Sequence, residues 1–150
     1  MLQLALGLLI MCVNGFVHGL VLSHAAGFLE RAKAWCVKTC SAHRYSAAMT
    51  ASIVVVMAAH FAGVLIWAAA FLVLDIFDDP STSLYFSIVA YTTLGFGDLI
   101  LPEPWRILSG MVAANGFLLF GWSTAFQMDF LTDLRQTGNR SIAPAAGGEE

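Results

Sequence analysis

Thr92-Thr93-Leu94-Gly95-Phe96-Gly97-Asp98 lies between two apolar runs of unequal length. The run before it, residues 83–91, is too short to cross a bilayer, whereas the run after it, residues 107–128, is long enough. Irregular, glycine-rich backbone at membrane depth is tolerated only where protein buries it or where it lines a water-filled path. The arrangement therefore predicts a loop that enters the membrane and returns to the side from which it came.

The composition of the chain is that of a membrane protein. Hydrophobic side chains make up 59% of the 150 residues and charged ones 11%, whereas soluble domains carry about 25% charged residues. Residues 1–29, 46–74 and 107–128 are each long and apolar enough to span a bilayer. A cleaved signal peptide is the alternative for the first stretch, but its first basic residue, Arg31, follows the apolar run. We therefore expect an all-α fold with three transmembrane helices.

Charge asymmetry predicts how these helices are oriented. The loop after the first stretch carries more basic than acidic side chains, the basic ones being Arg31, Lys33, Lys38 and Arg44. The positive-inside rule places such a loop in the cytoplasm. It predicts a cell (inner) membrane protein with its N terminus outside, its C terminus in the cytoplasm and residues 92–98 entered from outside. The loop itself is either an interfacial helix or an extension of the first span.

In this context Thr93-x-Gly95-x-Gly97-Asp98 resembles the selectivity filter of potassium channels. The resemblance covers residues 48–130 and implies an outer helix, a pore helix, a filter and an inner helix. One chain supplies one such loop, so the resemblance also implies a homotetramer embedded in membrane lipids. We expect four segments: an N-terminal transmembrane helix (1–29), a basic cytoplasmic or interfacial segment (30–46), the pore domain (47–133) and a disordered cytoplasmic tail (134–150).

The resemblance also assigns roles within the filter. Potassium ions would bind the carbonyl oxygens of Thr93, Leu94, Gly95 and Phe96 together with the Thr93 hydroxyl, in place of their hydration shell. In an extended strand successive carbonyls point in opposite directions. Gly95 and Gly97 relieve this, because glycine reaches positive φ without a Cβ clash.

The helix before the filter is predicted from its start. Asp79-Pro80 combines an N-cap side chain with a proline at the first helical position. A helix over residues 80–90 would be about 16 Å long, which reaches only halfway into a hydrocarbon core of about 30 Å. By the resemblance, Tyr85 and Phe86 would support the aromatic side chain of the filter, and Asp98 would lie at the outer mouth of the pore.

The implied function is passive, potassium-selective conduction without a catalytic step, an organic cofactor or a nucleic-acid partner. Three departures from the usual pattern leave alternatives open: Leu94 replaces Val or Ile, Phe96 replaces Tyr, and Val89 stands where some channels have a carboxylate. Fewer supports around the filter favour a weakly selective monovalent cation channel as the nearest alternative. A non-conducting accessory or sensor membrane protein is the alternative from another class.

The glycine and asparagine in the middle of the third span have two interpretations each. Gly116 is placed by the resemblance at the hinge of the inner helix, but a glycine can equally let two helices approach closely. Asn115 can face the central cavity or form a hydrogen bond between helices.

The first two spans are expected to pack through small residues. Gly15-x-x-x-Gly19 and Ala59-x-x-x-Gly63 lie at similar depth, and Asn14 can reach His60 across that contact. His60 is either a pH sensor or a neutral structural histidine, whereas His18 is expected to have no special role.

A metal site is the last candidate. Cys36, Cys40 and His43 fall on one helical face and could hold a metal, but zinc sites usually have four ligands. Reduced, unbonded thiols are the alternative.

Overall fold

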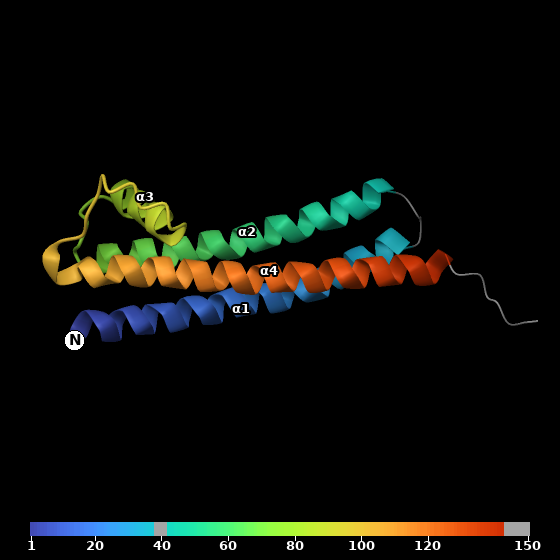
Figure 1. Cartoon of the computed structure of the whole chain (residues 1–150), viewed down its shortest axis with the longest axis horizontal. Coiled ribbons are helices and arrows are strands. Elements are labelled where there is room, and N and C mark those ends of the chain that lie inside the picture. The colour runs from blue at the N-terminus through green and yellow to red at the C-terminus, as the bar shows by residue number, and fades with distance from the viewer. Residues whose placement is uncertain (38–41, 143–150) are drawn as a thin grey trace, which may run out of the picture.

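The computed structural model describes the backbone of residues 1–37 and 42–142 and the side chains of residues 1–31 and 46–136. Its helices are α1 (Leu2–Val37), α2 (Ala42–Val73), α3 (Pro80–Tyr91), the short 3-10 helix η1 (Glu103–Trp105) and α4 (Arg106–Ile142). The helices α1, α2 and α4 extend along one common direction. The short α3 lies beside the C-terminal end of α2, which is the end closer to the N terminus of the chain (Figure 1).

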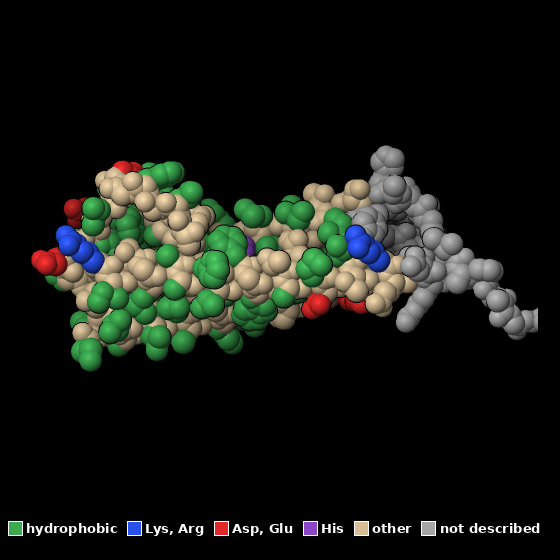
Figure 2. All heavy atoms as spheres, viewed as in Figure 1, with side chains coloured by type: hydrophobic (Ala, Val, Ile, Leu, Met, Phe, Trp, Pro, Cys, Tyr) green, Lys and Arg blue, Asp and Glu red, His purple; other side chains and the backbone are tan. Residues whose placement is uncertain are grey.

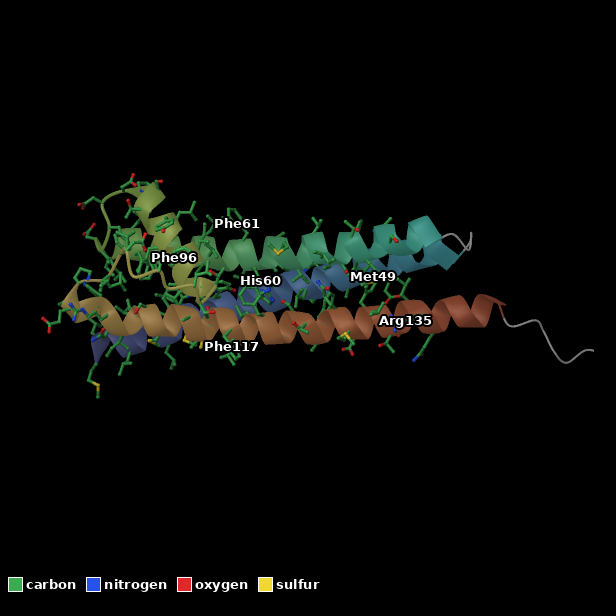
Figure 3. All side chains as sticks on the ribbon, turned by 45° about the horizontal axis from the view of Figure 1, so that its top comes forward. Met49, His60, Phe61, Phe96, Phe117 and Arg135 are labelled. Atoms are coloured by element: carbon green, nitrogen blue, oxygen red, sulfur yellow. The ribbon has the colours of Figure 1, made fainter. Side chains whose placement is uncertain are left out.

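The membrane-spanning segments agree with the sequence. Three helical segments are long and apolar enough to cross a membrane, namely Leu2–Arg31, Ser46–Val73 and Glu103–Gln136. Hydrophobic side chains cover the middle of the visible face, and charged ones gather toward its two ends (Figure 2). Phe61 and Phe117 point away from the bundle on opposite edges, where lipid can contact them (Figure 3). The predicted all-α membrane fold is confirmed over the described residues.

Two long helices extend beyond the segments expected from the sequence. α1 continues to Val37, which favours an extension of the first span over a separate interfacial helix. α4 continues to Ile142, so this part of the predicted disordered tail is helical. Leu134, at the start of this part, lies one helical turn after Phe130, and both are buried against α1 and α2 in a second hydrophobic cluster.

The main hydrophobic core lies where α3 meets α2 and α4. Its fully buried side chains include Trp67 and Phe71 from α2, Tyr91 from α3 and Leu108 from α4. This core holds a short helix against two long ones at one end of the bundle, which places the 92–98 loop between α3 and α4.

The helices α1 and α2 contact each other, but Gly15 and Gly19 of α1 do not face Gly63 of α2, as the prediction required. A Cβ at Gly63 would meet the Asn14 side chain at 2.7 Å, whereas one at Gly19 would meet Trp122 of α4 at 3.0 Å. Nothing lies within 4 Å of the corresponding position at Gly15. The helix α1 contacts both α2 and α4, and a pattern in the sequence of α1 does not specify which neighbour each glycine faces.

Candidate functional site

The short helix α3 begins as its sequence predicts. The Asp79 carboxylate accepts hydrogen bonds from the backbone N–H of Thr82 at 2.8 Å and from its hydroxyl at 3.0 Å. These bonds lower the pKa of Asp79 and satisfy the free N–H groups of the first turn. With 12 residues, α3 is about 18 Å long, which is shorter than a membrane span.

Contacts with α2 fix the direction of α3. The Ser83 hydroxyl donates a hydrogen bond of 2.7 Å to the carbonyl of Ala68. Phe86 is 5% exposed, and its ring lies edge-on to Phe71 at 5.4 Å and beside Phe77 at 5.3 Å. The C-terminal end of α3 is therefore held against the middle of the bundle, and its partial negative charge points there.

The 92–98 loop leaves α3 with positive φ at every second residue. These angles are 62° at Thr93, 54° at Gly95 and 78° at Gly97. Reversing the backbone at alternate positions counteracts the usual alternation of carbonyl directions along a strand, so carbonyl groups can turn toward one side. The expected positive φ at both glycines is present. The positive φ at Thr93 was not anticipated, since a β-branched residue is strained there.

Hydrogen bonds tie the start of the loop to the last turn of α3. The N–H groups of Leu94 and Gly95 both donate to the carbonyl of Val89, at 3.0 and 3.3 Å, and the N–H of Thr93 donates to Ala90 at 3.0 Å. Strain at Thr93 persists only where surrounding contacts impose it, and these bonds are such contacts.

The outer part of the loop is held by one side-chain hydrogen bond. The Tyr85 hydroxyl donates to the Asp98 carboxylate at 2.6 Å. This bond lowers the pKa of Asp98 and raises the pKa of Tyr85. Leu94 and Phe96 remain 58% and 67% exposed. Of the two aromatic residues predicted to support the filter, Tyr85 thus reaches the end of the loop, while Phe86 is buried on the side of α2.

An open cavity of about 300 Å³ lies behind the loop, between α3 and α4. Val89 and Gly95 line it on one side and Arg106 and Ala113 on the other. Val89 and Asp98 both line this cavity, and Val89 brings no charged group to this side of the loop.

The helix α4 passes directly against the end of α3. A Cβ at Gly116 would overlap the carbonyl oxygen of Tyr91, so the glycine permits this close approach. The neighbouring Asn115 lies between helices: its side-chain oxygen accepts hydrogen bonds from Asn14 of α1 at 2.7 Å and from Trp67 of α2 at 2.9 Å. The structure thus supports the packing interpretation of Gly116 and the interhelical one of Asn115. The hinge at Gly116 stays a prediction.

Two histidines are buried in the same region. His60 lies between α2 and α4 (Figure 3), and its Nδ1 is 3.3 Å from the Tyr91 hydroxyl. The Nε2 of His18 is 2.8 Å from the hydroxyl of Ser123, and the two histidine rings are 4.8 Å apart. The expected Asn14–His60 bond is replaced by these pairs, and His18, for which no special role is expected, takes part in one of them. We call the buried set of Asn14, His18, His60, Asn115 and Ser123 the polar centre.

Sequence reasoning missed how the polar centre is connected. Tyr91 gave no signal, because an aromatic residue in an apolar run is ordinary. A usable signal was the depth of Asn14, His18 and Asn115 in apolar spans, where polar side chains usually face other helices. The metal candidates Cys36, Cys40 and His43 lie outside the residues whose side chains are described, and the described side chains contain no cluster of three or more metal-ligating groups.

Three spans with a short re-entrant helix and an irregular glycine-containing loop define a membrane protein of the pore-loop class. Residues 59–133, half of the chain, match the model of a family described as Ion channel, which comprises two-span pore-loop channels. The chain belongs to this ion channel family. No curated protein and no solved structure matches the chain in the two other comparisons. The match begins within α2, so α1 lies outside it.

Proposed function

We propose that the chain is the subunit of a potassium-selective channel whose filter is formed by Thr93, Leu94, Gly95, Phe96 and Gly97. The observation that carries the proposal is the positive φ at residues 93, 95 and 97. These residues directly follow the short helix α3, within the part of the chain that matches the ion channel family. Such a backbone can present several carbonyl oxygens to one axis, and rings of carbonyl oxygens are what replaces the hydration shell of potassium.

The chemistry assigned to each group is simple. The carbonyls of Thr93, Leu94, Gly95 and Phe96 and the Thr93 hydroxyl coordinate potassium ions. The C-terminal end of α3 favours a cation at the inner end of the loop. Conduction is passive, so the protein needs neither an organic cofactor nor a catalytic step.

Four copies are required to close a ring around one axis. The exposure of Leu94 and Phe96 supports assembly, because one chain leaves these apolar side chains uncovered. We propose a homotetramer in lipid of the cell membrane, with the N terminus outside and the C terminus in the cytoplasm. Asp98 and the exposed Asp75, Asp78 and Asp79 then form an acidic outer mouth that concentrates cations.

The inner helix α4 supplies the gate in this proposal. Gly116 and Gly121 weaken its helix relative to alanine, and bending at Gly116 moves the part of α4 beyond it away from the pore axis.

A reversal potential tests the proposal. Purified protein is placed in a planar bilayer with potassium on one side and sodium on the other. Reversal near the potassium equilibrium potential is the expected result. Absence of current at all voltages, both in the unaltered protein and in a variant altered at Gly116 to open the gate, would contradict channel function and favour the non-conducting accessory or sensor protein.

A weakly selective cation channel is the second candidate. It is favoured by the sparse support of the loop. Among the described residues, the bond from Tyr85 to Asp98 is the hydrogen bond between a loop side chain and another side chain, while Val89 offers no charge. Reversal near zero with a measurable cation current would establish this candidate instead.

A further inference from the structure

The helix α1 lies outside the family match, yet it makes two buried polar contacts with α4. Asn14 donates to Asn115 at 2.7 Å, and His18 pairs with Ser123 at 2.8 Å. Contacts along α1 and α4 follow the same order, so the two helices run parallel. The first contact therefore lies nearer the 92–98 loop and the second nearer the opposite end of the bundle.

The two glycines in the middle of α4 lie between these contacts. Gly116 and Gly121 fall after Asn115 and before Ser123, and helices bend most readily where glycine lowers their stability. α1 therefore contacts α4 on both sides of these two glycines.

The second contact, between His18 and Ser123, consists of a hydrogen bond with an aromatic ring packed beside it. His18 is 0% exposed and Ser123 is 3% exposed. Beside them the ring of Trp122 lies over Gly19, where a Cβ would meet it at 3.0 Å, and it is 5.9 Å from the His18 ring. Separation at this depth removes the partner of the His18 Nε2 in hydrocarbon, where an unsatisfied polar group is costly, so the contact resists movement of α4 away from α1.

We propose that His18 is a positioning residue of the channel, which holds α4 straight across Gly116 and Gly121 by its bond to Ser123. The inference rests on the proposed function, in which bending at Gly116 opens the inner end of the pore. α4 is one continuous helix in this structure. Bending separates His18 from Ser123 but leaves Asn14 and Asn115 together, so the His18 contact favours the non-conducting conformation.

Single-channel recording of Ser123→Ala tests this directly. Loss of the hydroxyl shifts the gating equilibrium toward the open state by roughly 3- to 10-fold per subunit, the range for one buried hydrogen bond. Ser109→Ala is the matched control: the substitution and the helix are the same, but the Ser109 hydroxyl bonds to Arg106 of its own helix at 2.7 Å. An open probability for Ser123→Ala equal to or below that of Ser109→Ala overturns the proposal.

Two substitutions of His18 separate bonding from packing. The amide nitrogen of His18→Gln can take the place of Nε2 and bond to Ser123, so its open probability stays near that of the unaltered protein. His18→Leu removes the bond and raises the open probability as Ser123→Ala does. Equal open probabilities in these two variants contradict a role for the bond, and size-exclusion chromatography checks that both assemble.

A distance measurement separates failure of this inference from failure of the proposed function. Spin labels replace Phe28 of α1 and Met128 of α4, which are 56% and 57% exposed, in a cysteine-free background. Ser123→Ala adds a population with a longer distance between the labels, and Ser109→Ala does not. If neither the unaltered protein nor Ser123→Ala carries current, the proposed function fails while this measurement still tests the contact. Identical distance distributions in both variants overturn the inference.

Discussion

The 92–98 loop and the polar centre differ in how complete they are within one chain. The loop exposes Leu94 and Phe96 and is held at its outer end by one hydrogen bond between exposed side chains, from Tyr85 to Asp98. The polar centre is buried, and hydrogen bonds between helices connect it. Asn115, for example, accepts two hydrogen bonds at one oxygen, whereas Asn14 Oδ1, His18 Nδ1 and His60 Nε2 have no hydrogen-bond partner.

This difference predicts two kinds of mutant. Side chains of the loop have few contacts to lose in a single chain, so changes there should alter conduction more than folding. Side chains of the polar centre connect helices within one chain, so changes there should lower the free energy of unfolding first. Substitutions in each region therefore test whether the loop affects conduction and the polar centre affects stability.

Gly95→Ala is expected to have the largest effect, with loss of potassium current and retention of the assembled protein. No atom lies within 4 Å of a Cβ at Gly95, so folding of the chain survives. Its φ of 54° disfavours an alanine, which changes the direction of the neighbouring carbonyls. Current in a planar bilayer and assembly by size-exclusion chromatography are measured together.

Gly110→Ala is the control for this substitution. Gly110 also has open space around its Cβ position but lies inside α4 without a positive φ. Alanine is expected to be tolerated there and to stabilise the helix by up to about 1 kcal/mol. Selective potassium current in Gly95→Ala would show that the loop is not the filter.

Most of the fold could be predicted from hydropathy and glycine placement. The three spans follow from the length of the apolar runs. The start of α3 follows from Asp79-Pro80, and positive φ at Gly95 and Gly97 follows from the lack of a Cβ. Each of these features depends on residues close together in the sequence, which is why one sequence was enough to predict them.

The connections of the polar centre could not be predicted for the opposite reason. Asn14 and Asn115 are 101 residues apart, and His18 and Ser123 are 105 apart. Depth in the membrane placed Asn14 near His60, but rotation of each helix about its axis decides which neighbour a side chain meets. That rotation depends on packing of the whole bundle. Positive φ at Thr93 was missed because local preference argues against it.

Gly116→Ala is expected to have the next largest effect, here on stability. A methyl group at this position would overlap the backbone carbonyl of Tyr91, which cannot move as a side chain can. Overpacking of this kind costs about 1–3 kcal/mol. Thermal unfolding in detergent measures the loss, and Gly121→Ala is the control because its Cβ would have open space. Equal melting temperatures for the two variants would contradict the close contact between α3 and α4.

Asn115→Leu tests whether the polar centre joins three helices. The substitution removes the acceptor of both Asn14 and Trp67, and hydrogen bonds between membrane helices contribute about 0.6 kcal/mol each on average. We expect a loss of about 1–2 kcal/mol in the free energy of unfolding. Asn14→Leu removes one of the two donors to Asn115, together with the longer bond of 3.4 Å from Asn14 to the Gly63 carbonyl, and it leaves the bond from Trp67, so its loss should be smaller. If the two variants lost the same free energy of unfolding, Asn115 would not be the acceptor that Asn14 and Trp67 share.

Tyr85→Phe should have the smallest effect, and it should appear only in acid. The hydrogen bond from Tyr85 lowers the pKa of Asp98, so the carboxylate keeps its charge to a lower pH. Without the hydroxyl the pKa of Asp98 rises, and the negative charge at the proposed outer mouth of the pore is lost earlier as the pH on that side falls. Potassium current should therefore decline at a higher pH than in the unaltered protein, while currents at neutral pH agree.

Thr82→Val is the matched control for this pH dependence. The Thr82 hydroxyl bonds to Asp79 at the start of α3, and one of the bonds that lower the pKa of Asp79 is lost with it. Because Asp98 keeps its bond to Tyr85 in this variant, the decline of current in acid should stay where it is in the unaltered protein. An equal displacement in both variants would mean that overall acidity of the outer surface, and not Asp98 at the end of the loop, sets the response. The loop would then depend even less on contacts within its own chain than the structure indicates.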